Sequence, residues 1–346
     1  MTNNQLPITN IKSLLLILGP TGVGKTELSL RVAEHYGCPI ISCDSRQIYR
    51  GIPIGTAAPT AEEQARVKHY FIATRDLDED YNAGQYERDA LELLDRLFQT
   101  HQTLVMTGGS MLYADAVCHG LDDLPAVPPE IRRKVAYPQR CSTDGHRQSD
   151  RAELFTHEGK EESREEWLEW LQSEVQRLDP DYWNEVDRQN PARLMHCVEL
   201  CLTTGRPYSS LLTRKSKDER QKTRPFRIVK IGLDRDRAQL YARIDERVKQ
   251  MVADGLVEEA RRVYPQRHLN SLQTVGYKEM FAYFDGEYDL NRAIELIQQN
   301  SRHYAKRQLT WFRRDPQIHW LHANDAYEKN IYLIDDLLRH DGVQEE

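Results

Sequence analysis

Gly19-Pro-Thr-Gly-Val-Gly-Lys25-Thr26 follows the apolar run Leu14–Leu18 and precedes a segment with helical periodicity, Thr26–His35. The octapeptide fits G-x-x-x-x-G-K-[S/T] in full, and a strand before it with a helix behind it is the context that this motif requires. Its glycines let backbone N–H groups converge on phosphate oxygens, and the helix N-terminus adds partial positive charge. We therefore predict a phosphate-binding loop made of Gly19, Pro20, Thr21, Gly22, Val23, Gly24, Lys25 and Thr26, in which Lys25 reaches the terminal phosphates and the Thr26 hydroxyl suits Mg²⁺.

The segments that follow this loop alternate between the two kinds of secondary structure. Pro39–Ser42 and Thr103–Met106 are short and apolar, as strands are, whereas Ala83–Gln99 and Met111–Val117 show helical spacing. Strands that alternate with helices predict a parallel sheet in an α/β fold.

The composition changes after Gly120. Leu124-Pro-Ala-Val-Pro-Pro129 is rich in proline, and the next hundred or so residues carry helical but no strand patterns. Trp167, Trp170 and Leu171 fall at helical spacing there, and we expect them to be core. Phe226–Leu233 is predicted to be a strand that returns to the sheet. The predicted parts are a P-loop α/β core over 11–120, a helical insertion over 121–222, core completion with C-terminal helices over 223–325, and a C-terminal tail over 326–346.

The distribution of charge and cysteine limits the partners and metal sites that this chain is expected to have. The net charge of −7 argues against a nucleic-acid partner, but Arg214–Arg237 contains ten Lys and Arg against four acids, and such a basic stripe is the footprint of a phosphate backbone. The six cysteines form no CxxC pair. Cys197 and Cys201 share a helix face beside His196, and we favour core thiols there over a metal site. No signal peptide or membrane span is expected.

Asp44 is the candidate acid beside the phosphate loop. A P-loop nucleoside triphosphatase holds Mg²⁺ with an Asp that ends an apolar strand, but Thr103–Met106 runs into Thr107-Gly-Gly109 instead. Asp44 follows Ile40-Ile41, so it should emerge at the carboxyl edge of the sheet, beside the loop. There it could be a turn residue or a general base. Small-molecule kinases position an acid comparably, so Asp44 alone leaves an ATP-dependent kinase open.

Five further segments carry a family resemblance: Asp44–Ala57, Gly108–Tyr113, Asn190–Leu194, Gln273–Glu279 and Arg302–Arg313. Together, over about Leu14–Trp320, they resemble the tRNA dimethylallyltransferase family, also called tRNA isopentenyltransferases or IPP transferases. The resemblance implies transfer of the dimethylallyl group of dimethylallyl diphosphate to N6 of the adenosine 3′-adjacent to the anticodon in tRNA, with release of diphosphate. The phosphate loop would then hold a leaving group.

The resemblance also implies roles for individual residues. Asp44 corresponds to the general base, Arg247 to an arginine that contacts the diphosphate, and Ser110 to a threonine that hydrogen-bonds the base. Ala58 stands where the family commonly has lysine. From the residues alone, an arginine on a solvated helix face is the favoured interpretation of Arg247, and the resemblance reverses that preference. The resemblance also implies that the helical insertion over 121–222 binds tRNA. The family's tRNA contacts correspond to Asp44, Ser45, Arg46, Gln47, Ser110, Arg132, Ala192, Arg193, Leu194, Met195, His196, Gln273, Thr274, Val275, Gly276, Tyr277 and Lys278.

The sequence is therefore compatible with three functions. The first is prenyl transfer to the tRNA anticodon stem-loop with Mg²⁺ as cofactor; the second is a P-loop small-molecule kinase; the third is a non-catalytic RNA-binding protein with a vestigial P-loop. An intact Lys25-Thr26 together with Asp44 argues against the third. The lack of a zinc-finger pattern near the C-terminus favours a bacterial-type, cytoplasmic member, and a monomer is the default expectation.

Overall fold

The computed structural model describes residues 11–122, 124–136, 163–213, 219 and 224–340. Contacts divide the chain into two units: unit 1 comprises Met1–Leu121 and Lys217–Glu346, and unit 2 comprises Asp122–Ser216. Each unit has its own buried hydrophobic cluster. No helix in the described ranges is long and apolar enough to cross a membrane.

Unit 1 is built on a six-stranded sheet in the order β3-β2-β4-β1-β5-β6, in which every pairing is parallel. This arrangement confirms the predicted α/β class. Because the carboxyl ends of parallel strands meet at one edge, the loops after β1, β2 and β4 gather there. The strands are β1 (Ser13–Leu18), β2 (Ile40–Ser42), β3 (His69–Tyr70), β4 (Thr103–Thr107), β5 (Arg227–Asp234) and β6 (Ile318–His322).

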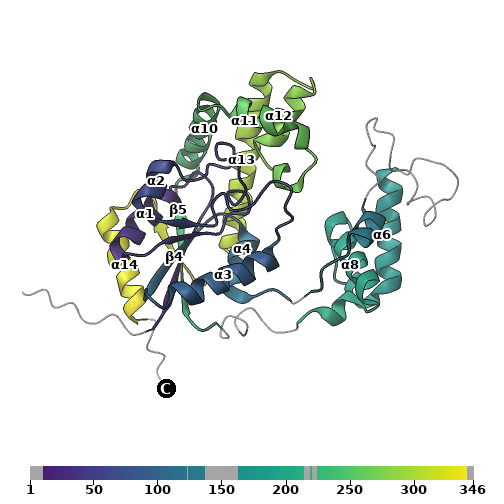
Figure 1. Cartoon of the computed structure of the whole chain (residues 1–346), viewed down its shortest axis with the longest axis horizontal. Helices are drawn as coiled ribbons and strands as arrows, with labels where there is room; N and C mark the ends of the chain where they lie inside the picture. Colours follow the sequence, from purple (N-terminus) through teal and green to yellow (C-terminus); the bar gives the residue numbers. More distant parts are fainter. Residues whose placement is uncertain (1–10, 123, 137–162, 214–218, 220–223, 341–346) are drawn as a thin grey trace, which may run out of the picture. The chain divides into compact units, whose positions relative to one another are not determined.

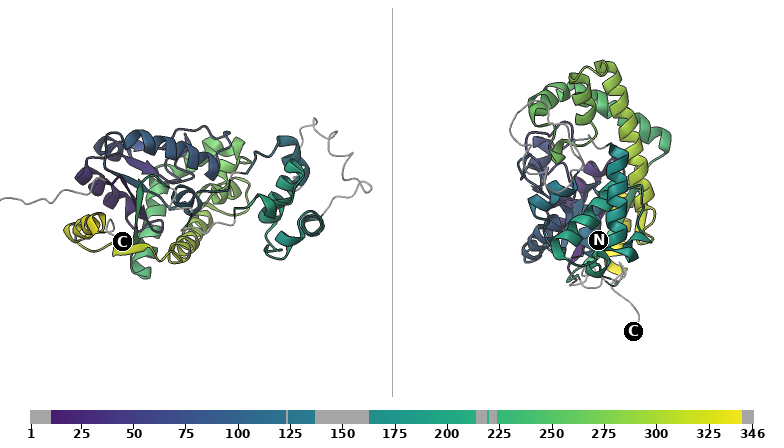
Figure 2. Two further views of the ribbon diagram at one scale, coloured as in Figure 1. Left: turned by 90° about the horizontal axis from the view of Figure 1, so that it is seen from below. Right: turned by 90° about the vertical axis from the view of Figure 1, so that its right-hand side faces the viewer.

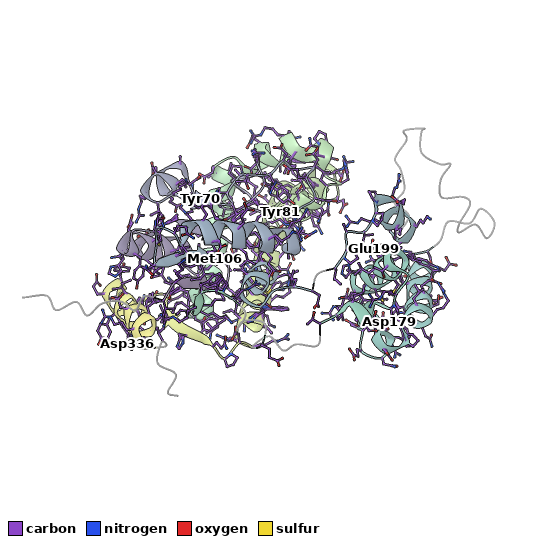
Figure 3. All side chains as sticks on the ribbon, turned by 60° about the horizontal axis from the view of Figure 1, so that its bottom comes forward. Tyr70, Tyr81, Met106, Asp179, Glu199 and Asp336 are labelled. Carbon is purple, nitrogen blue, oxygen red and sulfur yellow. The ribbon has the colours of Figure 1, made fainter. Side chains whose placement is uncertain are left out.

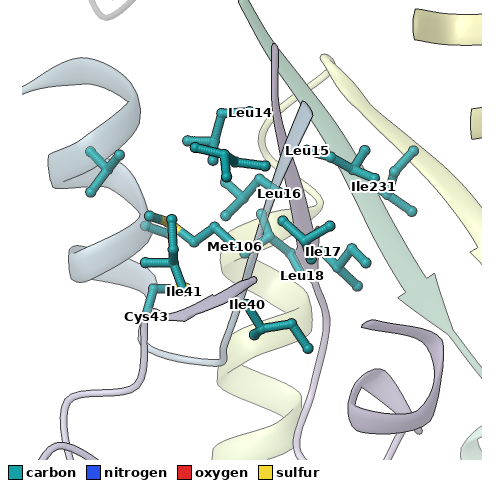
Figure 4. Packing of buried hydrophobic residues seen from close by; sticks show 14 of the residues in the cluster. Leu14, Leu15, Leu16, Ile17, Leu18, Ile40, Ile41, Cys43, Met106 and Ile231 are labelled. Atoms are coloured by element: carbon teal, nitrogen blue, oxygen red, sulfur yellow. The ribbon is translucent and has the colours of Figure 1, made fainter. Parts of the chain in front are cut away.

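β1 lies between β4 and β5 and is buried along its whole length. Leu14–Leu18 are at most 3% exposed, as expected for a central strand covered on both faces, which reads as a continuous apolar run. Figure 4 shows these side chains beside Ile40, Met106 and Ile231 from the neighbouring strands. The sheet is thus a rigid base for the loop that follows β1.

In the described part of unit 1, nine α-helices surround and extend the sheet. In Figure 1, α10, α11, α12 and α13 lie together, and they share a second buried cluster that includes Leu256, Tyr277 and Ile297. The helices are α1 (Lys25–Tyr36), α2 (Ala61–Arg66), α3 (Ala83–Leu97), α4 (Met111–His119), α10 (Arg237–Ala253), α11 (Leu256–Val263), α12 (Tyr277–Phe284), α13 (Leu290–Phe312) and α14 (Tyr327–His340), with 3₁₀ turns η2 (Tyr264–Gln266) and η3 (Asn270–Leu272).

Residues 326–346, expected only as a tail, contain α14 in their described part. Ile334 and Leu338 are buried in the main cluster, and Tyr36 on α1 donates a hydrogen bond to Asp335 at 2.6 Å. Figure 2 shows this yellow helix beside the purple N-terminal elements. The helix forms because its apolar residues recur every three or four positions, a pattern the sequence analysis overlooked.

Helices are the only regular secondary structure in the described residues of unit 2. α5 (Pro129–Val135), α6 (Arg164–Leu178), α7 (Pro180–Trp183), α8 (Pro191–Thr204) and the 3₁₀ turn η1 (Tyr208–Leu211) enclose its core. Trp167 is a core residue, as expected: it is 7% exposed and its Nε1 donates to the Val135 carbonyl at 3.1 Å. Figure 3 labels Asp179 and Glu199 among these helices.

Candidate active site

The phosphate loop, Gly19–Thr26, connects β1 to α1. Gly22 and Gly24 have φ of +79° and +115°, a conformation that side chains strongly disfavour. A Cβ at Gly22 would also lie 2.8 Å from the side chain of Ile244 on α10. Val23 is fully buried, so it offers the loop only its backbone. Gly24 stands where the motif requires glycine, whereas Gly22 occupies one of its unspecified positions, and the backbone of the loop needs glycine at both.

Lys25 lies over this loop. Its Nζ donates to the carbonyl oxygens of Gly19 and Pro20, both at 2.9 Å. Burial among protein atoms and the positive charge of Arg247 lower the pKa of Lys25 to about 8, although the Asp44 carboxylate acts in the opposite direction. An incoming polyanion would stabilise the charged form of this amine. Bound phosphate is therefore expected to keep Lys25 charged at pH values above about 8 as well.

Asp44 follows β2, as predicted, and lies within electrostatic reach of Lys25 and Arg247. Its Oδ1 accepts hydrogen bonds from the backbone N–H groups of Arg46 at 2.9 Å and Gln47 at 3.3 Å. Among the described residues, Oδ2 makes no hydrogen bond. The carboxylate is therefore held in place by one oxygen while the other can accept a proton.

Ser110 follows β4 and sits at the N-cap of α4. Its Oγ accepts from the Ser45 N–H at 2.8 Å and donates to the Ser45 Oγ at 3.0 Å. These bonds tie the loop after β4 to the loop after β2, so the structure brings the predicted residues Asp44, Ser45 and Ser110 together. With only 8% of Ser110 exposed, its hydroxyl is a small polar surface in a largely closed setting.

Arg247 lies on α10, far along the sequence from the phosphate loop. Its Nη1 donates to Thr21 Oγ1 at 3.4 Å, and burial lowers its pKa while Asp44 raises it. The solvated-face interpretation of this arginine is therefore wrong. Lys25, Arg247 and Asp44 form one charge cluster beside the phosphate loop.

Gln308 and Tyr304, both on α13, are residues of the site to which the sequence analysis gave no role. Gln308 hydrogen-bonds both the phosphate loop and the Gly109 carbonyl. Tyr304 donates to the same carbonyl at 3.4 Å, and burial together with the charge of Asp44 raises its pKa to about 12. Both lie inside the Arg302–Arg313 segment, so the family resemblance was the signal that could have found them.

Thr26 is the predicted Mg²⁺ ligand. It is exposed in the first turn of α1, and among the described residues its hydroxyl makes no hydrogen bond. A hydroxyl oxygen next to bound phosphate oxygens is the donor set that Mg²⁺ prefers, so the residues present fit the ion.

Asp44–Gln47, predicted to contact tRNA, are half-buried. All four side chains make hydrogen bonds within the protein, those of Asp44 and Ser45 as described above. Arg46 Nη1 donates to the Asn270 carbonyl at 2.7 Å, and Gln47 Nε2 donates to the Ala57 carbonyl at 3.0 Å. The Gln47 bond fixes the loop that carries Ala58.

The segment Gln273–Lys278 requires a correction at Tyr277. This residue was expected to contact tRNA, but it is fully buried. Its hydroxyl donates to Glu259 at 2.6 Å, and its ring fills the space left by the missing side chain of Gly55. Gln273 and Lys278 are exposed, Thr274 and Val275 are half-buried, and Gly276 is buried. Only part of this segment is therefore open to a ligand.

The predicted tRNA contacts of unit 2 lie on α5 and α8. Leu194 is wrong as a contact, because it is fully buried in the core of unit 2. Ala192, Met195 and His196 line a hollow of about 460 Å³. Arg132 and Arg193 are exposed.

Cys197 and Cys201 are buried core thiols, as favoured. Their sulfur atoms lie within 4.8 Å of each other and of an Asp179 oxygen. That carboxylate already accepts three hydrogen bonds, from the Tyr182 N–H and from the N–H and hydroxyl of Ser209. Its capping role accounts for its burial.

The basic stripe predicted over Arg214–Arg237 is wrong for its described central part. Arg224 pairs with Glu87 at 2.7 Å, and Lys230 is 3% exposed and pairs with Asp315 at 2.8 Å. Arg227 donates to the Leu338 carbonyl at 2.6 Å. These cations stabilise unit 1 rather than face a ligand. Arg214, Lys215, Lys217, Arg220 and Lys222 lie outside the described residues.

Fold and site together define a P-loop α/β protein with a carboxylate beside its phosphate loop. The family model for IPP transferase matches residues 47–315, and the chain belongs to this family. The predicted family is thereby confirmed, and the comparisons favour it over the kinase alternative.

Relatives and solved structures agree. A protein of Parabacteroides distasonis named tRNA dimethylallyltransferase 2 is 52% identical over 91% of this chain and 96% of its own length. A Bacteroides fragilis protein named tRNA dimethylallyltransferase 1 is 49% identical over 93% of this chain and 97% of its own length. The crystal structure of a full-length tRNA isopentenylpyrophosphate transferase from Bacillus halodurans is 31% identical, with a TM-score of 0.63 over 94% of this chain and 95% of that one.

Proposed function

We propose that this chain transfers the dimethylallyl group from dimethylallyl diphosphate to N6 of the adenosine 3′-adjacent to the anticodon in tRNA. The observation that carries the proposal is the charge cluster of Lys25, Arg247 and Asp44 at the phosphate loop. Two cations and converging N–H groups suit a diphosphate, and a carboxylate beside them suits an amine that must lose a proton.

In the proposed reaction the bond between the allylic carbon and the diphosphate oxygen breaks, and its electron pair leaves with diphosphate. The N6 amine forms the new C–N bond, and its proton passes to Asp44 and then to water. Lys25 and Arg247 stabilise the charge that develops on the leaving group, a contribution that typically exceeds other single effects. Thr26 would hold Mg²⁺ together with oxygens of the diphosphate, and the ion would neutralise part of the same charge.

Ser110 and Ser45 lie next to Asp44 and offer hydroxyls to a base. The target adenosine must leave its stack to reach them, at a cost of about a few kcal/mol. The exposed residues Arg132, Arg193, Gln273 and Lys278 are proposed tRNA contacts. A tRNA substrate fits a cytoplasmic protein, and a monomer is the proposed state.

The proposed function is tested by measuring the transfer of label from dimethylallyl diphosphate to tRNA. The protein is incubated with Mg²⁺, dimethylallyl diphosphate labelled in the prenyl group, and total tRNA, with ATP supplied in a parallel reaction. We expect label in tRNA, at an adenosine beside the anticodon after nuclease digestion. Turnover of ATP without any labelled tRNA would contradict the proposal and favour the small-molecule kinase instead.

A further inference from the structure

Gln308 is a polar side chain in the middle of unit 1. It lies on α13 and is only 1% exposed. A buried amide is costly unless it is hydrogen-bonded, and both ends of this one are. Its Nε2 donates to the Gly109 carbonyl at 2.7 Å, and its Oε1 accepts from the Thr21 N–H at 2.8 Å. The side chain therefore bridges two loops through their backbones.

The two bridged loops carry different halves of the site. Thr21 belongs to the phosphate loop, and its side chain accepts the bond from Arg247. Gly109 immediately precedes Ser110, whose hydroxyl is bonded to the Ser45 loop next to Asp44. Gln308 thus joins the diphosphate side of the site to the side that is proposed to receive the base.

The fit around Gln308 is close. A Cβ built at Gly109 would overlap the amide nitrogen of Gln308 and approach Lys25 Nζ to 4.0 Å. Tyr304, one turn earlier on α13, donates to the Gly109 carbonyl as well. The amide therefore occupies a place shaped for it by glycine, and α13 holds this carbonyl at two points.

We propose that Gln308 is a positioning residue that fixes the distance between the phosphate loop and the Ser110–Asp44 side of the site. This inference rests on the proposed function. Transfer needs the allylic carbon and N6 within about 3–3.5 Å, and a misplacement of about 1 Å can cost up to about a hundredfold in rate. In the proposed reaction the diphosphate binds at the phosphate loop and the base at the Ser110–Asp44 side, so loss of the bridge should affect reaction more than binding.

Gln308→Met removes both hydrogen bonds with little change in volume. We expect the single-turnover rate of prenyl transfer to fall by about 10- to 100-fold, while the KM values for dimethylallyl diphosphate and tRNA stay within about threefold. Gln298→Met is the matched control: it lies on the same helix, and its Nε2 donates to the Asp245 carbonyl at 3.1 Å, which belongs to α10 and to neither bridged loop. We expect the control to keep the wild-type rate.

The variant Gln308→Glu tests the bridge through the pH dependence of its transfer rate. A purely structural role of Gln308 would not produce the pH dependence described here. An ionised carboxylate keeps the acceptor for Thr21 N–H but faces the Gly109 carbonyl without a proton to donate. Protonation at lower pH restores the donor, so the ratio of variant to wild-type rate should rise as pH falls. A ratio that is flat across pH would count against the bridge.

Hydrogen exchange tests the same bridge without any substrate. In Gln308→Met, protection should fall together in the peptides that cover 19–24 and 107–111, and Gln298→Met should leave both unchanged. The hydrogen-exchange result tests the bridge even if the wild-type protein transfers no label. Failure of the wild-type protein to transfer label would contradict only the proposed function. A Gln308→Met protein with the wild-type rate and unchanged exchange in both peptides, losing only unfolding stability, would overturn the inference.

Discussion

The phosphate loop and the segment Gln273–Lys278 are both recognised from sequence, yet they use their residues in opposite ways. The phosphate loop keeps its hydrophobic side chain, Val23, in the core, and its backbone and Lys25 are the groups proposed to bind the ligand. In Gln273–Lys278, the aromatic residue is buried and holds other loops in place. A motif therefore marks a site without saying which of its residues touch the ligand.

The buried network around Tyr277 shows what the second segment does. Glu259 is fully buried, and its carboxylate accepts from Tyr277 and from the N–H groups of Ile54 and Gly55 at 2.9 and 2.8 Å. The loop held in this way continues to Ala57, whose carbonyl is bonded to Gln47. The exposed neighbours Gln273 and Lys278 are left as candidates for direct contact.

Among the variants of the phosphate-loop site, Asp44→Asn should reduce kcat most. The amide keeps an oxygen for the N–H groups of Arg46 and Gln47 but cannot accept the N6 proton. We expect kcat to fall by about 10²–10⁴-fold, with tRNA affinity nearly unchanged in a filter-binding assay. An equal loss of tRNA affinity would make Asp44 a recognition residue instead.

Lys25→Met should have the second largest effect. We expect kcat to fall by about 10²–10³-fold, the range for losing one group that stabilises developing charge. The lowered pKa adds a pH test. Because the amine is charged below about pH 8 and neutral above it, the affinity for inorganic diphosphate should fall as pH rises through that value. Calorimetric titration of wild type and Lys25→Arg separates this effect from ionisation of diphosphate itself, since the arginine stays charged. An equally steep fall in both proteins would remove Lys25 as the cause.

Tyr277→Phe tests the buried side of the comparison. Loss of the hydroxyl leaves the Glu259 carboxylate short of one donor, so we expect the free energy of unfolding to drop by about 1–3 kcal/mol, measured by urea denaturation. The kcat should stay close to that of the wild type at a temperature where both are folded. If the ring instead stacked on a base, this variant would keep both its stability and its activity.

Arg193→Ala should give the smallest change. This exposed arginine is a proposed phosphate or base contact, so the salt dependence of tRNA binding should weaken by about one unit of slope. Arg224→Ala is the comparison, because Arg224 is half of an internal ion pair. We expect Arg224→Ala to lower stability while the salt slope stays the same. The reverse pattern would restore the basic stripe as the RNA-facing surface.

Much of the fold was predictable because its signals are local. The phosphate loop, the strands at Leu14–Leu18 and Thr103–Met106 and the helix at Met111–Val117 each have a pattern within a few residues. β3 has only two residues and carried no signal, and α14 was taken for a tail. The family and the fold class are confirmed, whereas the domain bounds and residue roles stay predictions.

The parts that could not be predicted depend on distant residues. Nothing near Gln308 indicates that its amide meets Thr21 and Gly109, since those contacts span 287 and 199 residues. The same holds for the burial of Tyr277 against Gly55, and for Lys230, whose partner Asp315 lies 85 residues away. Charge or aromaticity in a sequence does not show whether a side chain faces solvent or a partner inside the fold.

The central claim is that the phosphate loop holds a leaving group. Its most direct test is the stoichiometry of diphosphate release in a reaction with tRNA, dimethylallyl diphosphate and Mg²⁺ but no ATP. The account predicts one diphosphate for each prenylated adenosine, and no effect of added ATP other than competition for the loop. A requirement for ATP, or ATP cleavage in step with transfer, would contradict it.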